Sequence, residues 1–333
     1  MTPVPSPATD PDAAGAAPAA GAVPAAGEQD ERLDLVAVGE AMAVISPDPP
    51  VPLREAATLR MSSAGAESNV ATWLAGLGLR TMFASRVGDD PFGRLILDNL
   101  AAAGVRVSVD VDARAPTGIY FKNPSGYGTK VHYYRAGSAA SHMDATFWQA
   151  CPPARLVHLS GITPALSAGC ADLVSVGLAA RPVPGATMSF DVNFRPTLWE
   201  PSQAGPLLAA LANLADVVFV GLDEAQVLWG AASAADVREA IDKPAQLVVK
   251  DGAVGATLFD GDDVLFEPVT PIEVVEPVGA GDAFAAGYLY GLLTGCPPGE
   301  RLRYGHLLAG AALATTADVG VPLTPTQLMG EHR

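Results

Sequence analysis

Short apolar runs alternate with longer helical patterns along most of the chain after residue 32. The runs are rich in Val, Leu, Ala and Phe and end at glycine or polar residues; they cover 35–38, 81–87, 105–111, 156–159, 186–190, 217–220 and 247–250. The predicted helices between and after them cover 62–75, 91–103, 165–180, 206–214, 233–241 and 302–316. Apolar strands separated by helices predict an α/β fold whose mostly parallel sheet is covered on both faces.

One stretch, 117–135, departs from this alternation. Two aromatic and β-branched runs flank the turn-forming residues 123–128, which is the pattern of a β-hairpin. Together with part of the irregular segment 41–60, it predicts a small sheet that stands off the main domain and is a candidate lid. The lid strands are expected at about 41–60 and 116–136.

The first 31 residues have a different composition. They are mostly Ala, Pro and Gly, and residues 1–30 contain no Lys or Arg and no apolar periodicity. We expect a disordered tail over 1–31 and one folded domain over 32–333. The sequence has neither a signal-peptide pattern nor an apolar run of the roughly 18–20 residues that span a bilayer, so we expect a cytoplasmic protein with no membrane partner.

The net charge of −16 argues against a nucleic-acid partner, because phosphate backbones attract clustered Lys and Arg. The three cysteines form no CxxC pair, so neither a disulfide framework nor a zinc site is expected. Parallel sheets bind ligands beyond the carboxyl ends of their strands. That rule brings the polar residues that follow the apolar runs, at 39–40, 191–195, 221–224 and 250–255, to one edge of the sheet.

The segment Gly279-Ala280-Gly281-Asp282 follows a β-branched run and precedes a small, apolar helical pattern. Backbone N–H groups of these glycines at a helix N-terminus would attract an anion. Asp282 would then stand beside that anion as a base for phosphoryl transfer. The alternative is a tight glycine turn with a helix-capping aspartate, and the segment alone does not separate the two.

Two separated motifs resemble a known family. They are residues 279–284 and, far upstream, Gly65-Ala66-Glu67-Ser68-Asn69-Val70-Ala71, with the hairpin between them. Over about 32–325 the chain resembles the PfkB (ribokinase-like) carbohydrate kinases. Residues 39–42, 117–121, 133–141 and 191–196 make the match closest to the 2-keto-3-deoxygluconate kinases. The resemblance implies a ribokinase-like three-layer α/β/α domain with a small β-sheet lid, and the use of ATP and Mg²⁺.

The resemblance also implies roles for individual residues. Asp282 would be the catalytic base, and the anion hole would be formed by Gly279, Ala280 and Gly281. The sugar acid would be surrounded by Gly65, Ala66, Asn69, Tyr120, Tyr133, Arg135, Arg195 and Asp282. The nucleotide would lie against Asn193, Lys250, Gly252, Gly255, Ala256, Gly279, Gly281 and His306. Glu224 would help to hold the metal indirectly.

Residue chemistry agrees with these roles but leaves alternatives. Arginine binds a carboxylate with two parallel hydrogen bonds, which suits Arg135 and Arg195; either could instead pair with a protein carboxylate. Tyr120 and Tyr133 could bond sugar hydroxyls or simply pack in the hairpin. Lys250 could equally be a strand-end lysine in solvent.

Three positions depart from the family pattern. Pro277 and Val278 stand where threonines are usual, Gly221 replaces the asparagine of an Asn-x-x-Glu motif that ends at Glu224, and His306 replaces an asparagine near the adenine.

The predicted function is ATP-dependent phosphorylation of a primary hydroxyl of a sugar acid, with 2-keto-3-deoxygluconate converted to its 6-phosphate. Alternatives are a kinase for fructose, ribose or 2-keto-3-deoxygalactonate, and a non-catalytic sugar-acid sensor, against which the retained Asp282 argues. A dehydrogenase and a P-loop kinase are excluded, because no G-x-G-x-x-G follows the first strand and no G-x-x-x-x-G-K-[ST] occurs. An exposed apolar lid face makes a homodimer through the lid a further expectation.

Overall fold

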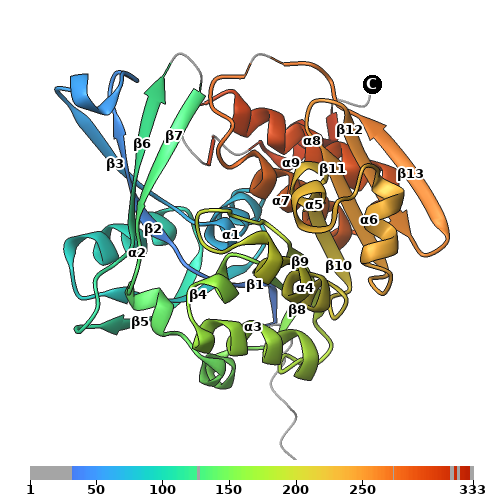
Figure 1. Ribbon diagram of the computed structural model, residues 1–333, viewed down its shortest axis with the longest axis horizontal. Helices are drawn as coiled ribbons and strands as arrows, with labels where there is room; N and C mark the ends of the chain where they lie inside the picture. Colours follow the sequence, from blue (N-terminus) through green and yellow to red (C-terminus); the bar gives the residue numbers. More distant parts are fainter. Residues whose placement is uncertain (1–31, 126–127, 273, 316–318, 321–322, 331–333) are drawn as a thin grey trace, which may run out of the picture. The chain divides into compact units, whose positions relative to one another are not determined.

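The computed structural model describes residues 32–333 apart from 126–127, 273, 316–318, 321–322 and 331–333. The expected tail over 1–31 lies outside the described residues. A nine-stranded sheet runs through the domain in the order β13-β12-β11-β10-β9-β8-β1-β4-β5 (Figure 1). Its strands are β1 Leu33–Val38, β4 Thr81–Gly88, β5 Arg106–Asp112, β8 Ala154–Ser160, β9 Thr187–Asp191, β10 Val217–Gly221, β11 Gln246–Asp251, β12 Gly255–Asp260 and β13 Asp263–Pro268. The seven strands from β11 to β5 in this order are parallel to one another, and β12 pairs antiparallel with both β11 and β13.

Helices cover both faces of this sheet. In β1, Leu35 and Ala37 pack into one core, whereas Val36 and Val38 pack into the other. The first core lies under α1 Ala66–Gly76, α2 Pro91–Ala102, α7 Ala280–Leu293 and α8 Pro298–Leu313. The second lies under α3 Ala168–Ala180, α4 Pro201–Ala212, α5 Leu222–Trp229 and α6 Ala234–Ala240. The predicted three-layer architecture is confirmed, because side chains that alternate along a strand need cover on both faces.

A separate four-stranded sheet, called the small sheet below, has the order β3-β2-β6-β7. Its strands are β2 Met42–Pro47, β3 Leu59–Ala64, β6 Ile119–Ser125 and β7 Gly128–Tyr134. The predicted hairpin over 117–135 is confirmed as the antiparallel pair β6–β7, and β2 joins it by parallel pairing with β6. One face of the small sheet buries Met42, Val44 and Tyr120.

Helices α4 and α5 are among those that differ from the prediction. The helix predicted over 206–214 begins at Pro201, which takes the first helical position, and Pro206 lies inside it. Proline suits a helix start because its missing N–H needs no partner there, and in the sequence both Pro201 and Pro206 fit that position. Helix α5 was not predicted at all, because it begins directly at the end of β10 without turn residues between them.

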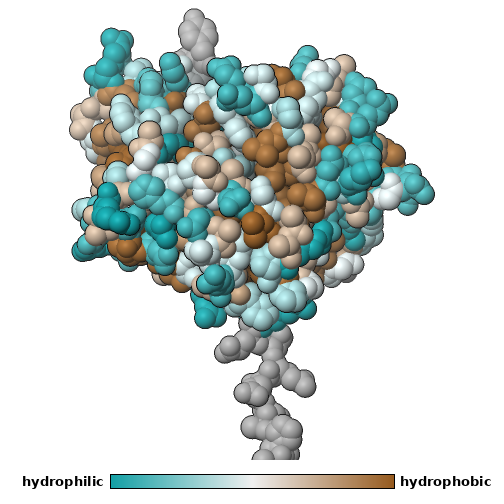
Figure 2. All heavy atoms as spheres, turned by 60° about the horizontal axis from the view of Figure 1, so that its bottom comes forward, coloured by the Kyte–Doolittle hydropathy of each residue, from teal (hydrophilic) through white to brown (hydrophobic). Residues whose placement is uncertain are grey.

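The remaining elements are short: η1 Leu53–Glu55, η2 Ala139–His142, η3 Ala145–Ala150, η4 Thr163–Ala165 and α9 Pro325–Gly330. Within the described part of the chain, no helix is long and apolar enough to cross a membrane. Figure 2 brings forward the side that carries α3 at the bottom of Figure 1, and hydrophobic and hydrophilic residues are interspersed on it.

Candidate active site

The carboxyl ends of β1, β9, β10 and β11 lie at one edge of the central sheet, as their parallel pairing requires. Glu40 follows β1, Asp191 ends β9, Glu224 lies in the first turn of α5 after β10, and Lys250 lies near the end of β11. The predicted convergence of polar residues is therefore observed. Such an edge is where parallel α/β sheets bind their ligands.

Asp282 lies in the first turn of α7, at this edge. The helix is capped by Gly279, whose φ of 87° is in the left-handed region that glycine adopts without steric cost. The Asp282 Oδ2 atom accepts a hydrogen bond of 2.8 Å from Asn69 Nδ2, and its Oδ1 atom accepts one of 3.4 Å from Asn193 Nδ2. The first N–H groups of a helix have no partner within it, so the turn beside Asp282 can bind an anion.

The backbone of Asn193 has an unusual conformation. Its φ of 41° is rare for a residue other than glycine, although asparagine adopts it more readily than most. The residue is only 4% exposed, and its Oδ1 atom is buried without a hydrogen-bond partner. A buried acceptor with no donor costs free energy unless a ligand donates a hydrogen bond to it or a cation binds to it.

Lys250 is largely buried and bonded to Asp191. Its Nζ atom lies 3.0 and 3.3 Å from the two carboxylate oxygens of Asp191, which is 2% exposed. Burial disfavours the charged ammonium group, but the neighbouring carboxylates of Asp191 and Glu224 outweigh it and raise the pKa of Lys250. Lys250 is therefore not the solvent-exposed strand-end lysine that the sequence offered as an alternative.

Two carboxyl groups in this cluster hold protons unusually tightly. Burial raises the pKa of Asp282 to about 7, the hydrogen bond from Asn69 opposes the shift, and the Asp191 charge adds to it. Burial likewise raises the pKa of Glu224 to about 7. The guanidinium of Arg195, 3.5 Å from Glu224 Oε1, and the Lys250 ammonium work against both shifts.

Arg135, which directly follows β7, is paired inside the protein. Its Nη2 atom donates to Glu40 Oε2, and Ser138 Oγ donates to Glu40 Oε1 at 2.6 Å. The side chains of Arg135 and Glu40 are only 7% and 1% exposed. Of the two alternatives for Arg135, the structure contains the ion pair with a protein carboxylate. The side chain of Arg195 is 40% exposed.

The tyrosines of the small sheet pack together. The rings of Tyr120 and Tyr133 lie 5.6 Å apart, and the Arg135 guanidinium lies 5.7 Å from the Tyr133 ring centre. Tyr120 is buried, whereas Tyr133 is partly exposed. The structure thus brings Tyr120, Tyr133 and Arg135 into one group and Asn69 and Asp282 into another.

Gly65 caps the start of α1, and Ala66 is its first residue. A Cβ atom at position 65 would overlap the carbonyl oxygen of Glu40, so glycine is needed for α1 to approach the end of β1. No role in the site is predicted for the next residue, Glu67. It is 1% exposed, accepts hydrogen bonds from Ser160 and Thr163, and burial raises its pKa.

The predicted nucleotide residues lie along the β11–β12 turn and α8. Gly252 and Gly255 are in or beside the turn, and Ala256 pairs with Lys250 across the two strands. His306 Nε2 lies 3.1 Å from the carbonyl oxygen of Glu267 in β13, and its ring packs against Phe284. Burial lowers the pKa of His306, so the ring is neutral near pH 7.

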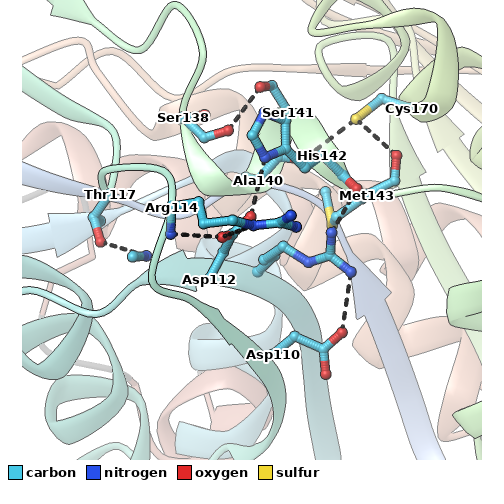
Figure 3. A network of polar contacts seen from close by, with 12 residues as sticks. Asp110, Asp112, Arg114, Thr117, Ser138, Ala140, Ser141, His142, Met143 and Cys170 are labelled. Carbon is cyan, nitrogen blue, oxygen red and sulfur yellow. Dashed lines mark hydrogen bonds and ion pairs between the residues drawn. The ribbon is translucent and has the colours of Figure 1, made fainter.

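A polar network fixes the segment that leaves the small sheet after β7 (Figure 3). Arg86 in β4 donates to the His142 carbonyl at 2.7 Å and to Asp110 at 3.3 Å. His142 Nδ1 lies 3.0 Å from Asp112 at the end of β5, and Cys170 Sγ in α3 lies 3.3 Å from the carbonyl of residue 140. The exit of the small sheet is thus attached to both β5 and α3.

No group of three His, Cys, Asp or Glu side chains able to hold a metal ion occurs among the residues that the structure describes. Two buried carboxylates, Asp191 and Glu276, were assigned no role from the sequence. The charge of Asp191 acts on Asp282, whereas Glu276 bonds to Thr129 of the small sheet. Asp191 could have been found from its place at a strand end. Glu276, which is 5% exposed, could not, because its contacts come from distant parts of the chain.

A nine-stranded, mostly parallel sheet between two helical layers, with a separate four-stranded sheet, defines a ribokinase-like fold. The family described as pfkB family carbohydrate kinase matches residues 32–323. The chain therefore belongs to the pfkB family of carbohydrate kinases.

Curated and solved relatives cover nearly the same part of the chain. It is 36% identical over 305 residues to the 2-dehydro-3-deoxygluconokinase of Bacillus subtilis (strain 168), covering 87% of this chain and 93% of that protein. It is 31% identical over 303 residues to the 2-dehydro-3-deoxygalactonokinase of Haloferax volcanii, covering 89% and 95%. A crystal structure of a PfkB protein from Polaromonas sp. JS666 is similar with a TM-score of 0.77 and 35% identity, covering 87% and 97%.

Proposed function

We propose that this kinase transfers the terminal phosphoryl group of ATP to a primary hydroxyl of a sugar acid, 2-keto-3-deoxygluconate, and so makes its 6-phosphate. The observation that carries the proposal is the Asp282 carboxyl group at the N-terminus of α7, where burial raises its pKa to about 7. A general base works best when its pKa is near the working pH. The 2-dehydro-3-deoxygluconokinases among the relatives support the choice of substrate.

In this mechanism Asp282 accepts the proton of the attacking hydroxyl. The hydrogen bond from Asn69 holds its carboxylate in place, and Asn69 would also contact the sugar. The N–H groups of Gly279, Ala280 and Gly281 face the transferring phosphoryl group, whose negative charge grows in the transition state. Lys250 lies near the β11–β12 turn, which carries Gly252 and ends at Gly255, and it pairs with Ala256 across the two strands. It supplies positive charge on the nucleotide side.

The acceptor-rich cluster fits Mg²⁺ bound with the nucleotide. Asn193 Oδ1 is a buried acceptor without a donor, and burial raises the pKa of Glu224, a shift to which the negative charge of Asp191 adds. Magnesium is commonly held by one or two protein oxygens together with water and phosphate, so Glu224 would act through water. When bound, Mg²⁺ neutralises charge on the phosphate oxygens. His306 and Phe284 would border the base of the nucleotide.

The carboxylate of the substrate would meet the arginines. Arg195 has an exposed guanidinium beside the cluster, whereas the guanidinium of Arg135 would have to bind Glu40 and the substrate at the same time. Tyr120 and Tyr133 would border the sugar from the small sheet, which acts as the lid, and Gly65 and Ala66 from the start of α1. A sugar acid rather than a neutral sugar is favoured because two arginines flank one edge of a protein with strong net negative charge.

A homodimer through the small sheet is part of the proposal. The face opposite Tyr120 carries Leu59, Met61 and Tyr134, which are 49%, 58% and 67% exposed. A hollow of about 490 Å³ opens on that face beside Phe121 and Tyr134. Light scattering on the purified protein, with Tyr134→Lys as the disrupting variant, tests this expectation. A cytoplasmic location, where ATP is available, stays a prediction.

The function is tested by a coupled ADP-release assay with 2-keto-3-deoxygluconate, 2-keto-3-deoxygalactonate, fructose and ribose. We expect the highest kcat/KM with 2-keto-3-deoxygluconate, and phosphorus NMR should place the new phosphate on carbon 6. A higher kcat/KM with 2-keto-3-deoxygalactonate would identify that epimer as the substrate instead. Sugar-acid binding without ADP release would mean a sensor and would overturn the kinase assignment.

A further inference from the structure

A hydrogen bond joins the small sheet to the loop that leads into α7. Thr129, the second residue of β7, donates from Oγ1 to Glu276 Oε2 at 2.8 Å, although the two residues are 147 positions apart. Figure 1 shows the β6–β7 hairpin beside the segment between β13 and α7. Glu276 is only 5% exposed. The contact is partly buried and joins the proposed lid to the approach to the proposed anion hole.

Glu276 also holds its own loop. Its second carboxylate oxygen accepts from the N–H of Val278 at 3.4 Å, and its backbone N–H donates to the carbonyl of Leu313 at the end of α8 at 3.3 Å. Gly279, the cap of α7, is three residues further on. Glu276 thus joins its loop to the small sheet through its side chain and to the end of α8 through its backbone N–H.

The composition of the loop makes this side chain important. From 274 to 281 the sequence is Val-Val-Glu-Pro-Val-Gly-Ala-Gly, so Glu276 is its only residue with a polar side chain. The threonines that the family commonly has before the glycines are absent. A buried carboxylate needs hydrogen-bond donors, and hydrogen bonds to charged groups are stronger than those between neutral ones. Movement of the hairpin away from the loop would remove the Thr129 donor.

We infer that Thr129 and Glu276 are positioning residues that couple the placement of the lid to the conformation of the anion-hole loop. This inference rests on the proposed function. A sugar acid that holds the lid in place keeps the Thr129 donor on Glu276, and Glu276 in turn keeps the loop in the shape that presents Gly279 to Gly281 to the phosphates. Coupling between two binding sites is reciprocal, so each ligand increases the affinity for the other by the same factor.

Calorimetry on the full chain tests this coupling. The non-hydrolysable analogue AMP-PNP with Mg²⁺ is titrated with and without saturating 2-keto-3-deoxygluconate. In the wild type, the sugar acid should tighten binding of the analogue. Thr129→Val keeps the shape but removes the hydroxyl, and we expect the enhancement to fall by about tenfold, in line with the loss of one hydrogen bond to a charged group. Thr129→Ser keeps the hydroxyl and should restore most of it.

Three further variants separate coupling from general damage to the fold. Thr187→Val makes the same change at the amino end of β9, away from the site edge, and should leave the enhancement unchanged. Glu276→Gln should reduce the enhancement, and the double variant with Thr129→Val should be no worse than the poorer single variant. Such non-additivity is the sign of a direct interaction.

Turnover provides the second measurement. Thr129→Val should lower kcat for the sugar acid by about tenfold and release more ADP per sugar phosphate formed, because a loosely held lid admits water. A wild type that phosphorylates the sugar acid while Thr129→Val keeps full coupling and full kcat would overturn the inference alone. A wild type that phosphorylates no sugar acid would overturn the proposed function and the inference with it.

Discussion

Two clusters of charged side chains lie at the same edge of the central sheet, and their hydrogen bonding differs. The Glu40 cluster contains Glu40, Arg135 and Ser138, and there one carboxylate receives a guanidinium and a hydroxyl. In the Asp282 cluster, three carboxylates share one largely buried ammonium and one half-exposed guanidinium; its members are Asp191, Arg195, Glu224, Lys250 and Asp282. The first cluster is balanced in charge, and its unpartnered buried group is a donor, Arg135 Nε. The second cluster has an excess of acceptors.

The difference separates structural support from chemistry. A balanced buried pair holds two elements in place, here the end of β1 and the exit of β7, and gains little from a further ligand. An acceptor-rich cluster is unfavourable by itself, since two of its carboxyl groups have pKa values raised to about 7. It becomes favourable when it receives a proton or cation, and perturbed groups of this kind concentrate at functional sites. Changes in the two clusters should therefore have opposite effects on stability.

The largest effect is expected for Asp282→Asn. The amide cannot accept the hydroxyl proton, so kcat should fall by about 10²- to 10⁴-fold, the range for loss of a general base. Binding of AMP-PNP, measured by calorimetry, should remain within a few-fold of the wild type. Near-normal kcat would show that Asp282 caps the helix and is not the base.

The same variant should stabilise the fold above neutral pH. The folded-state pKa of Asp282 is raised from 3.8 to about 7, so the wild-type fold loses stability as the pH rises through that interval. At about pH 8 the ionised carboxylate opposes folding, and Asn removes it. We expect a gain on the order of 2 kcal/mol in urea unfolding at about pH 8, and almost none at about pH 4. A loss of stability at the higher pH would contradict the comparison of the clusters.

Arg135→Met should destabilise the fold, whereas Asp282→Asn should stabilise it above neutral pH. It leaves Glu40 buried without its cation, and removal of one partner of a buried ion pair costs about 3–5 kcal/mol of unfolding free energy. Adding Glu40→Gln removes the unpaired charge while keeping an acceptor for Ser138, so more than half of the loss should be recovered. Urea unfolding of both variants measures this. Equal stability of the single and double variants would mean that the pair does not hold β1 and β7 together.

The double variant also tests whether Arg135 binds substrate. If its guanidinium meets the sugar acid as well as Glu40, KM for 2-keto-3-deoxygluconate should rise by about tenfold or more, whereas KM for fructose should change little. Equal changes for the acid and the neutral sugar would restrict Arg135 to its structural role. Arg195→Met provides the comparison, since Arg195 is half-exposed and not part of the Glu40 cluster.

Residues whose roles depend on local sequence were predictable. Gly279 and Asp282 follow from a turn and a helix start, and Asp191 and Lys250 from the ends of apolar strands. Partners chosen by tertiary packing were not predictable. Arg135 finds Glu40 across 95 residues, and Thr129 finds Glu276 across 147. Apolar periodicity fixes which face of a strand is buried, but it does not determine which of several carboxylates a given arginine or hydroxyl will meet.

The smallest predicted effect lies within the Asp282 cluster and concerns its pH dependence. Since Asp282 must lose its proton to act as the base, kcat/KM should rise with pH and reach half its maximum near pH 7. The Lys250 ammonium opposes the rise in the pKa of Asp282, so Lys250→Met should move the midpoint upward by about one unit. Lys243→Met removes an exposed lysine paired with Asp242 and should leave the midpoint unchanged. An unshifted profile in Lys250→Met would mean that the charges of the cluster do not act on its base, and the contrast with the balanced Glu40 cluster would then lose its physical basis.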